Sequence, residues 1–282
     1  MDSPTHVPSQ KYRGRLAPSP TGLLHVGHAK TFWTAQERVR RDGGELILRN
    51  EDLDQVRCRK EFVSAMVEDL RWFGFNWSEG PDVGGRFAPY SQSERMPFYC
   101  EALEKLQADG YLYPCTCSRR DVQSAVTAPH VGDEEPIYPG RCRGKRLSEI
   151  AGKIFSWRFR VPEGEAISFT DENVGEQRFV AGRDFGDFVV WRPDGVPAYQ
   201  LACVVDDVAM QITEVVRGAD LLVSTARQIL IYRALGRMPP LFFHCELVKD
   251  QRGRRLAKRH DSLSLRKLRA HGMTPDTLRK NW

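Results

Sequence analysis

The sequence predicts an α/β fold: a doubly wound parallel sheet that carries an inserted subdomain and ends in a short helical tail. Strand-like and helix-like segments alternate near the amino terminus, as they do in parallel sheets covered by helices on both faces. Between residues 111 and 183 the residue composition changes: Cys, Pro and Gly cluster, and the β-like runs are short. This change indicates an insertion. Regular segments then return, and about thirty residues remain for the tail.

Length and composition indicate a folded protein. The chain has 282 residues, of which 41% are hydrophobic and 28% charged, enough to bury one large core or two modest ones. No apolar run approaches the length of a membrane span. Residues 1–12 are polar and proline-containing, so we expect a loose arm and not a secretory signal. The seven cysteines favour free thiols or metal binding over disulfides, and we expect a cytoplasmic protein.

The first expected strand and helix frame a candidate phosphate site. A β-prone run from Tyr12 to Leu16 is broken by prolines, and a helical pattern follows from about Val26 to Arg41. His25 and His28 lie three residues apart at the start of that helix and therefore share one face. A helix amino terminus presents unpaired backbone N–H groups, which suit a phosphate-bearing ligand.

The next strand and helix place acidic side chains near this site. Residues Glu45–Glu51 are expected to form a buried strand, and Cys58–Phe73 a helix that stops at Gly74. In parallel sheets the ligand binds beyond the carboxyl ends of the strands. Glu51 and the turn before the first helix both fall on that edge. A further helix is expected over about residues 94–109.

Cysteines in the expected insertion form a candidate metal site. Cys115 and Cys117 are followed by Cys142, and three thiolates with a fourth donor would close a tetrahedral zinc site. Free buried thiols explain the same spacing equally well. His130 lies between the cysteines and is a rival ligand, although an exposed loop histidine is the simpler interpretation.

The carboxyl-terminal half supplies further regular segments and a basic loop. Regular segments are expected over Asp187–Trp191, Tyr199–Val205, Thr225–Leu235 and Leu241–Val248. Five basic residues then fall within eight positions, namely Arg252, Arg254, Arg255, Lys258 and Arg259. This clustering favours contact with phosphate or nucleic acid. A solvated surface loop is the alternative for a run of charge alone.

The same sheet edge offers groups that would recognise an amino acid. An ammonium group needs a carboxylate partner, and a carboxylate suits arginine, which pairs with two oxygens at once. The candidates are Arg15, Glu51, Tyr199 and Arg217. Arg15 or Glu51 alone is explained as well by an ordinary surface ion pair. The four together favour binding of an amino acid.

Two segments carry a family resemblance. Residues Arg13–His28, which read strand, turn, His-Val-Gly-His and helix, resemble the nucleotide-binding signature of class I aminoacyl-tRNA synthetases, in the form used by the glutamyl branch. The loop Gly253–Arg259 resembles the second signature of that family, Lys-Met-Ser-Lys-Ser. Arg255 and Lys258 take the places of its two lysines, whereas Ala257 replaces its usual serine. The resemblance covers nearly the whole chain.

This resemblance implies a Rossmann-like catalytic core, a set of substrate contacts and one structural zinc ion. It implies that ATP, with Mg²⁺, is bound by His25, Gly27, His28, Arg255 and Lys258. The expected catalytic residues, which stabilise charge on the phosphates, are His25, His28 and Lys258. Glutamate is expected at Arg15, Ala17, Ser19, Glu51, Tyr199 and Arg217. Short members of the glutamyl branch bind zinc through a Cys-x-Cys…Tyr-x-x-x-Cys pattern, which here corresponds to Cys115, Cys117, Tyr138 and Cys142.

The resemblance also implies a reaction. A full glutamyl-tRNA synthetase continues well beyond the position of Trp282 into an anticodon-binding domain, so this chain resembles the short branch that modifies queuosine in tRNA(Asp). Glutamate and ATP are expected to give glutamyl adenylate, and the glutamyl group then passes to a ring hydroxyl of queuosine in the anticodon. A monomer is expected. The alternatives are a minimal enzyme that charges the 3′ end of tRNA(Glu) and a non-catalytic tRNA-binding relative.

Five segments are expected along the chain. They are a flexible arm over residues 1–12, the first half of the nucleotide-binding domain over 13–110, the inserted subdomain with the zinc site over 111–183, the second half of the catalytic domain with the basic loop over 184–260, and a short helical tail over 261–282.

Overall fold

The protein divides into two compact units, which are described separately. The computed structural model describes residues 11–118, 121, 137–247, 264–280 and 282. The first unit comprises the described parts of Met1–Ser91, Gln211–Arg217 and Pro240–Trp282, and the second unit those of Gln92–Met210 and Gly218–Pro239. The two units are distinguished by their compactness, and their boundaries do not test the five segments expected from the sequence. Those five segments stay a prediction.

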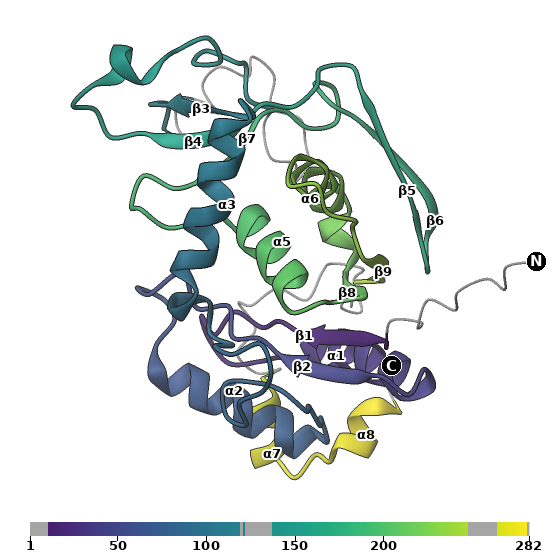
Figure 1. Ribbon diagram of the computed structural model, residues 1–282. Coiled ribbons are helices and arrows are strands. Elements are labelled where there is room, and N and C mark those ends of the chain that lie inside the picture. Colours follow the sequence, from purple (N-terminus) through teal and green to yellow (C-terminus); the bar gives the residue numbers. More distant parts are fainter. Residues whose placement is uncertain (1–10, 119–120, 122–136, 248–263, 281) are drawn as a thin grey trace, which may run out of the picture. The chain divides into compact units, whose positions relative to one another are not determined.

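The first unit begins with two parallel strands joined by a helix. β1 (Arg13–Leu16) and β2 (Glu45–Leu48) pair along their full length, and the strands run in the same direction. α1 (Val26–Arg41) connects them and packs against both strands (Figure 1). Such a connection is the repeating unit of parallel sheets. It confirms the alternation expected from the sequence, and α1 has the expected bounds.

A second strand pair joins the first through one threonine. β8 (Glu214–Gly218) and β9 (Leu241–Cys245) are hydrogen-bonded neighbours. The N–H of Thr213, just before β8, donates to the Arg13 carbonyl at 3.0 Å, and the Thr213 carbonyl accepts from the Leu241 N–H at 2.9 Å. The last expected strand is therefore confirmed as β9, whereas the sequence pattern did not indicate β8.

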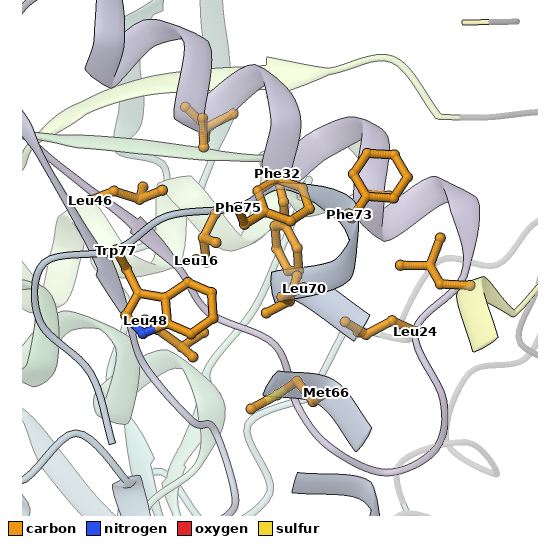
Figure 2. Close-up of a cluster of buried hydrophobic side chains, with 14 of the residues drawn as sticks. Leu16, Leu24, Phe32, Leu46, Leu48, Met66, Leu70, Phe73, Phe75 and Trp77 are labelled. Atoms are coloured by element: carbon orange, nitrogen blue, oxygen red, sulfur yellow. The ribbon is translucent and has the colours of Figure 1, made fainter. Parts of the chain in front are cut away.

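The core of the first unit combines aliphatic side chains with a group of aromatic rings. α2 (Lys60–Phe73) ends, as expected, at Gly74, whose φ of 97° lies in the left-handed region that favours glycine. Phe32, Phe73 and Phe75 gather beside the two strands, and the rings of Phe73 and Phe75 stack with centroids 5.4 Å apart (Figure 2). Each such side chain contributes about 1.5–3 kcal/mol through burial.

The expected helical tail is present and docks on this core. Its two short helices are α7 (Leu265–Ala270) and α8 (Pro275–Arg279). Arg266 of α7 donates a hydrogen bond from Nε to Asp69 of α2 at 3.1 Å. The ring of Trp282 stacks on Phe73 with centroids 5.7 Å apart. An ion pair and a ring stack therefore hold the tail against the first unit.

The second unit combines an antiparallel sheet, a hairpin and helices. The sheet consists, in spatial order, of β3 (Leu112–Cys115), β4 (Ser156–Phe159) and β7 (Phe188–Trp191). The hairpin pairs β5 (Ala166–Asp171) with β6 (Gly175–Val180) (Figure 1). The helices are α3 (Met96–Ala108), α5 (Tyr199–Ala209) and α6 (Leu222–Ala234). Short 3₁₀ turns are η1 (Gln92–Glu94), η2 (Leu147–Ile150) and η3 (Ala219–Leu221).

Several element ends differ from the expected ones by a few residues. The strand expected over Glu45–Glu51 ends at Leu48, and the helix expected over Cys58–Phe73 begins at Lys60. The regular segment expected after residue 199 is a helix that extends to Ala209. Such ends depend on hydrogen bonds to distant residues, which a local pattern does not contain. For example, the segment beyond β2 pairs its backbone with Tyr90.

A buried carboxylate joins α3 to α5 in the second unit. Asp206 accepts hydrogen bonds from Arg95 Nε at 2.6 Å and from Gln92 Nε2 at 2.8 Å. The Tyr99 hydroxyl donates to the same carboxylate at 2.9 Å. Asp206 is 0% and Arg95 1% exposed. Removing one partner of such a pair leaves a buried charge without compensation, which costs about 3–5 kcal/mol.

We predict that Asp206→Ala lowers the free energy of unfolding by about 3–5 kcal/mol, because the guanidinium of Arg95 stays buried without this carboxylate. Urea unfolding followed by circular dichroism measures the change. Asp109→Ala is the matched control, since Asp109 forms an exposed pair with Lys105 that is worth at most about 1 kcal/mol. Equal losses in the two variants would show that burial of the pair carries no special stabilisation.

Candidate active site and metal centre

The two histidines of the first motif form a reciprocal cap on α1. His25 is the N-cap residue, and its Nδ1 accepts a hydrogen bond from the Gly27 N–H at 3.1 Å. The Nδ1 of His28 accepts from the His25 N–H at 3.3 Å. The two rings lie with their centroids 3.8 Å apart. Because Nδ1 is an acceptor in both rings, each neutral imidazole carries its proton on Nε2, where it is a donor suited to phosphate oxygen.

Gly27 and Ser264 both lie next to His25 at the amino terminus of α1. A Cβ on Gly27 would lie 3.0 Å from the Cε1 atom of His25, so a side chain there would press on the capping ring. Ser264, where the described chain resumes before α7, forms an antiparallel backbone bridge with His25. The basic-loop residues Arg255, Ala257 and Lys258 lie outside the described residues.

Two arginines predicted to bind glutamate are brought together by the strands of the first unit. Arg15 belongs to β1 and Arg217 to β8, and both are buried. The Nη1 of Arg15 donates to the carbonyl of Val216 at 3.0 Å. Val216 immediately precedes Arg217, so this bond places the two guanidinium-bearing residues on adjoining backbone segments. A paired arrangement of this kind suits a ligand with carboxylates.

Glu51 lies in the same unit, and hydrogen bonds hold both its backbone N–H and its carboxylate. Its N–H donates to the Pro18 carbonyl at 3.0 Å, which extends the β1–β2 pairing beyond the strands. Its carboxylate accepts a hydrogen bond from Arg49 Nη2 at 3.1 Å. Ala17 and Ser19 flank Pro18, and Ala17 is half-buried whereas Ser19 is exposed. The backbone thus brings a buried carboxylate next to the segment that follows β1.

Sequence reasoning missed a residue that contacts Arg217. His244 on β9 is completely buried, and its Nε2 lies 3.2 Å from the Nε of Arg217. Arginine has no acceptor, so Arg217 donates and the neutral imidazole carries its proton on Nδ1. Phe242, two residues earlier, lies under the same guanidinium at 5.5 Å. The signal in the sequence was a single polar residue inside the apolar run Leu241–Cys245.

Tyr199, the remaining residue predicted to bind glutamate, belongs to the second unit. It is the first residue of α5 and is 39% exposed. Its ring is therefore accessible within its own unit.

Three cysteines converge in the second unit. The sulfur atoms of Cys115, Cys117 and Cys142 all lie within 4.8 Å of one another, and those of Cys117 and Cys142 are 3.7 Å apart. The Tyr138 hydroxyl oxygen lies 3.4 Å from Cys115 Sγ and 3.5 Å from Cys117 Sγ. Around one tetrahedral zinc ion, two sulfurs are about 3.8 Å apart and a sulfur and an oxygen about 3.5 Å apart. The cluster therefore fits a metal ion.

Hydrogen bonds within the cluster favour a thiolate. Burial raises the pKa of Cys142, but hydrogen bonds from the Tyr138 hydroxyl, from the Thr116 backbone and from Cys117 outweigh burial and lower that pKa to about 6. Burial and hydrogen bonds to the three thiols raise the pKa of Tyr138. Since the thiolate is the form of cysteine that binds metals, the protein environment prepares Cys142 for a cation.

Comparison with known proteins gives the family. Over residues 11–281 the chain matches the family described as "tRNA synthetases class I (E and Q), catalytic domain". The chain belongs to this family. Within it the chain belongs with the glutamyl-Q tRNA(Asp) synthetases, being 51% identical to the "Glutamyl-Q tRNA(Asp) synthetase" of Symbiobacterium thermophilum, a match that covers 94% of this chain and 83% of that protein. The resemblance inferred from the two signatures is therefore confirmed.

Glutamate-specific synthetases are also similar to this class I synthetase. The "Glutamate--tRNA ligase 2" of Syntrophus aciditrophicus is 42% identical, over 96% of this chain and 56% of that protein. The crystal structure of the glutamate-tRNA synthetase from Elizabethkingia anophelis matches with a TM-score of 0.79 at 29% identity, over 94% of this chain and 54% of that chain. The chain thus spans about half the length of these two proteins. The class I synthetase fold expected from the sequence is confirmed.

Among the described helices, none is long and apolar enough to cross a membrane.

We predict that the three-cysteine cluster binds one thiol-seeking divalent cation. Co²⁺ added to metal-free protein should produce the absorption of cobalt–thiolate bonds, and Cys117→Ser should weaken binding strongly because one thiolate is lost. Cys100→Ser is the control, since Cys100 lies in α3 and is not part of the cluster. Unchanged cobalt binding by Cys117→Ser would contradict the prediction.

Proposed function

We propose that this class I synthetase activates L-glutamate with ATP and transfers the glutamyl group to queuosine in the anticodon of tRNA(Asp). The observation that carries the proposal is the 51% identity to a relative named Glutamyl-Q tRNA(Asp) synthetase, against 42% to one named Glutamate--tRNA ligase. The paired histidines and the buried arginines of the first unit support the same chemistry. Because ATP, glutamate and tRNA are found in the cytoplasm, we propose that the protein is cytoplasmic. We also propose that it acts as a monomer.

The glutamate pocket is proposed to use charges of both signs. Arg15 and Arg217 would pair with carboxylates, since a guanidinium offers parallel N–H donors to two oxygens. Glu51 would accept from the ammonium group of the substrate. Ala17 and Ser19 supply the segment beside Glu51, and Tyr199 completes the proposed set. The burial of Arg15, Glu51 and Arg217 supports this assignment, because charges act more strongly away from water.

The ATP site is proposed at the amino terminus of α1. His25 and His28 would donate from Nε2 to phosphate oxygens, and Gly27 leaves room for the His25 ring. Arg255 and Lys258 of the basic loop would neutralise charge on the triphosphate, and Mg²⁺ would enter with ATP.

The reaction then needs positioning more than acid–base chemistry. An α-carboxylate oxygen of glutamate attacks the α-phosphorus of ATP, a carboxyl oxygen–phosphorus bond forms, and pyrophosphate leaves. In the second step a ring hydroxyl of queuosine attacks the acyl carbon and loses its proton to solvent, an ester bond forms, and the bond from the acyl carbon to the phosphate oxygen breaks as AMP leaves. Both steps are accelerated when the reacting groups are held close together in the correct orientation, an effect worth several kcal/mol.

The three-cysteine cluster is proposed to hold one structural zinc ion. Cys115, Cys117 and Cys142 would supply thiolates and Tyr138 the fourth ligand, and the distances among these four atoms support that set. When bound, zinc would tie the end of β3 to the loop that carries Tyr138 and Cys142, since structural zinc ions contribute folding energy.

The proposed reaction predicts transfer of labelled glutamate, with ATP, to tRNA(Asp) that contains queuosine and to no tRNA without it. Counting acid-precipitated label on tRNA prepared with and without queuosine measures this. Label on unmodified tRNA(Glu) would instead make the protein a minimal glutamyl-tRNA synthetase. No label on either tRNA, with no glutamate-dependent pyrophosphate exchange, would make it a non-catalytic tRNA-binding relative.

A second prediction separates the two tasks of His25. His25→Ala should lower the free energy of unfolding by about 1 kcal/mol through loss of the cap, whereas His25→Asn should keep it near that of the original protein, because Asn is among the best N-cap residues. Both variants should lose glutamate-dependent pyrophosphate exchange by roughly 100-fold, since neither has the Nε2 donor. Urea unfolding and exchange assays measure the two effects.

His271→Ala serves as the control for that experiment. His271 is an exposed histidine of the tail whose Nδ1 contacts the Lys267 carbonyl at 2.7 Å. Its removal should leave pyrophosphate exchange unchanged. Full exchange activity in His25→Asn would mean that His25 acts only as a helix cap.

A further inference from the structure

A buried arginine lies directly against the three-cysteine cluster. Arg158 of β4 is only 8% exposed. Its Nε donates to Cys115 Sγ at 3.2 Å, and its guanidinium carbon lies 3.9 Å from the centroid of the Tyr138 ring. One guanidinium therefore contacts two of the four residues proposed to hold zinc.

The sheet fixes the position of this guanidinium. The Nη1 of Arg158 donates to the Asp187 main-chain carbonyl at 3.0 Å. The Asp187 carboxylate has other partners: it accepts from the Tyr113 hydroxyl at 2.6 Å and from the Val161 N–H at 2.8 Å. Tyr113 lies opposite Arg158 in the β3–β4 ladder. The backbone and a carbonyl thus hold the arginine in place beside the cysteines.

The charge of Arg158 needs an anionic partner, and the cluster offers one. Arginine stays protonated in proteins, and a buried guanidinium is costly unless a negative group lies beside it. Among the described residues, no carboxylate forms an ion pair with Arg158. The side chain that accepts its Nε hydrogen bond is instead Cys115. Three thiolates around a divalent cation carry a net negative charge, which would compensate the guanidinium.

We propose that Arg158 is the positioning residue and counter-charge of the metal centre. This inference rests on the proposed zinc site. The guanidinium stabilises the metal-bound cluster by donating an N–H to Cys115 and by lying over the face of Tyr138, which fixes the orientation of that ring. Outer contacts of this kind change metal affinity by about 10–100-fold when they are removed. The positive charge lowers the free energy of the metal-bound state more than that of the empty thiols.

Zinc affinity of the purified, full-length protein tests the inference. Competition with a chromophoric chelator should show a dissociation constant about 10–100-fold higher in Arg158→Gln than in the original protein. Arg158→Lys keeps the charge and should stay within about threefold. Arg158→Met fills similar space without charge and should weaken binding as Arg158→Gln does, which guards against failure of one variant to fold.

Arg160→Gln is the matched control. Arg160 is the residue directly after β4, and its guanidinium carbon lies 5.0 Å from the ring centroid of Tyr113. Within the described part of the chain, the cluster of Cys115, Cys117 and Cys142 has no hydrogen bond from Arg160. Its zinc affinity should equal that of the original protein. The Co²⁺ spectrum provides a second readout, and its thiolate bands should shift in Arg158→Gln but not in Arg160→Gln.

The outcomes separate this inference from the proposed zinc site. If the original protein binds zinc and both uncharged Arg158 variants bind it equally well, the role of Arg158 is wrong while the zinc site stands. Equal weakening by Arg160→Gln would also overturn it, since general loss of positive charge would then explain the effect. If the original protein binds no zinc, both proposals fall.

Discussion

The parallel pairing of the chain after Tyr12 with the chain after Gly44 determines where the candidate substrate residues of the first unit lie. The pairing continues past the strands, because the Arg49 N–H donates to the Leu16 carbonyl at 2.8 Å and the Glu51 N–H to the Pro18 carbonyl at 3.0 Å. These are main-chain bonds, so they position Arg15 and Glu51 without relying on either side chain.

Two buried arginines in the second unit differ in role because their guanidinium groups have different hydrogen-bond partners. Arg95 pairs with the carboxylate of Asp206, and this pair joins two helices. Arg158 has the same buried charge, but it donates to a sulfur and to a carbonyl. A carboxylate compensates the charge within the protein, whereas a thiol does so only as a thiolate. The first arrangement stabilises the fold, and the second favours a bound cation that keeps the sulfurs ionised.

Local signals in the sequence predicted much of the fold, and long-range contacts account for what it missed. The bounds of α1 and the end of α2 at Gly74 were predictable, because caps and apolar periodicity lie within a few residues. The spacing of the three cysteines allowed either a shared metal site or separate buried thiols, and the structure brings their sulfur atoms together. The contact between Arg217 and His244 joins residues 27 positions apart on strands whose pairing no local pattern encodes. Arg158 had no signal, since one arginine in a short strand resembles any surface charge.

The cap on α1 explains why two imidazoles stand at this helix terminus where lysine or arginine would bind phosphate more strongly. Each ring accepts a backbone N–H at Nδ1, which an ammonium or guanidinium group cannot do because it has no acceptor. Protonation of either ring would place a proton on Nδ1 and remove that bond, so the cap requires neutral histidines. A neutral imidazole that accepts at Nδ1 necessarily donates at Nε2. The helix needs Nδ1 of each ring as an acceptor, and this need sets the tautomer in which Nε2 is a donor for phosphate. The same hydrogen bonds therefore serve both folding and the proposed chemistry.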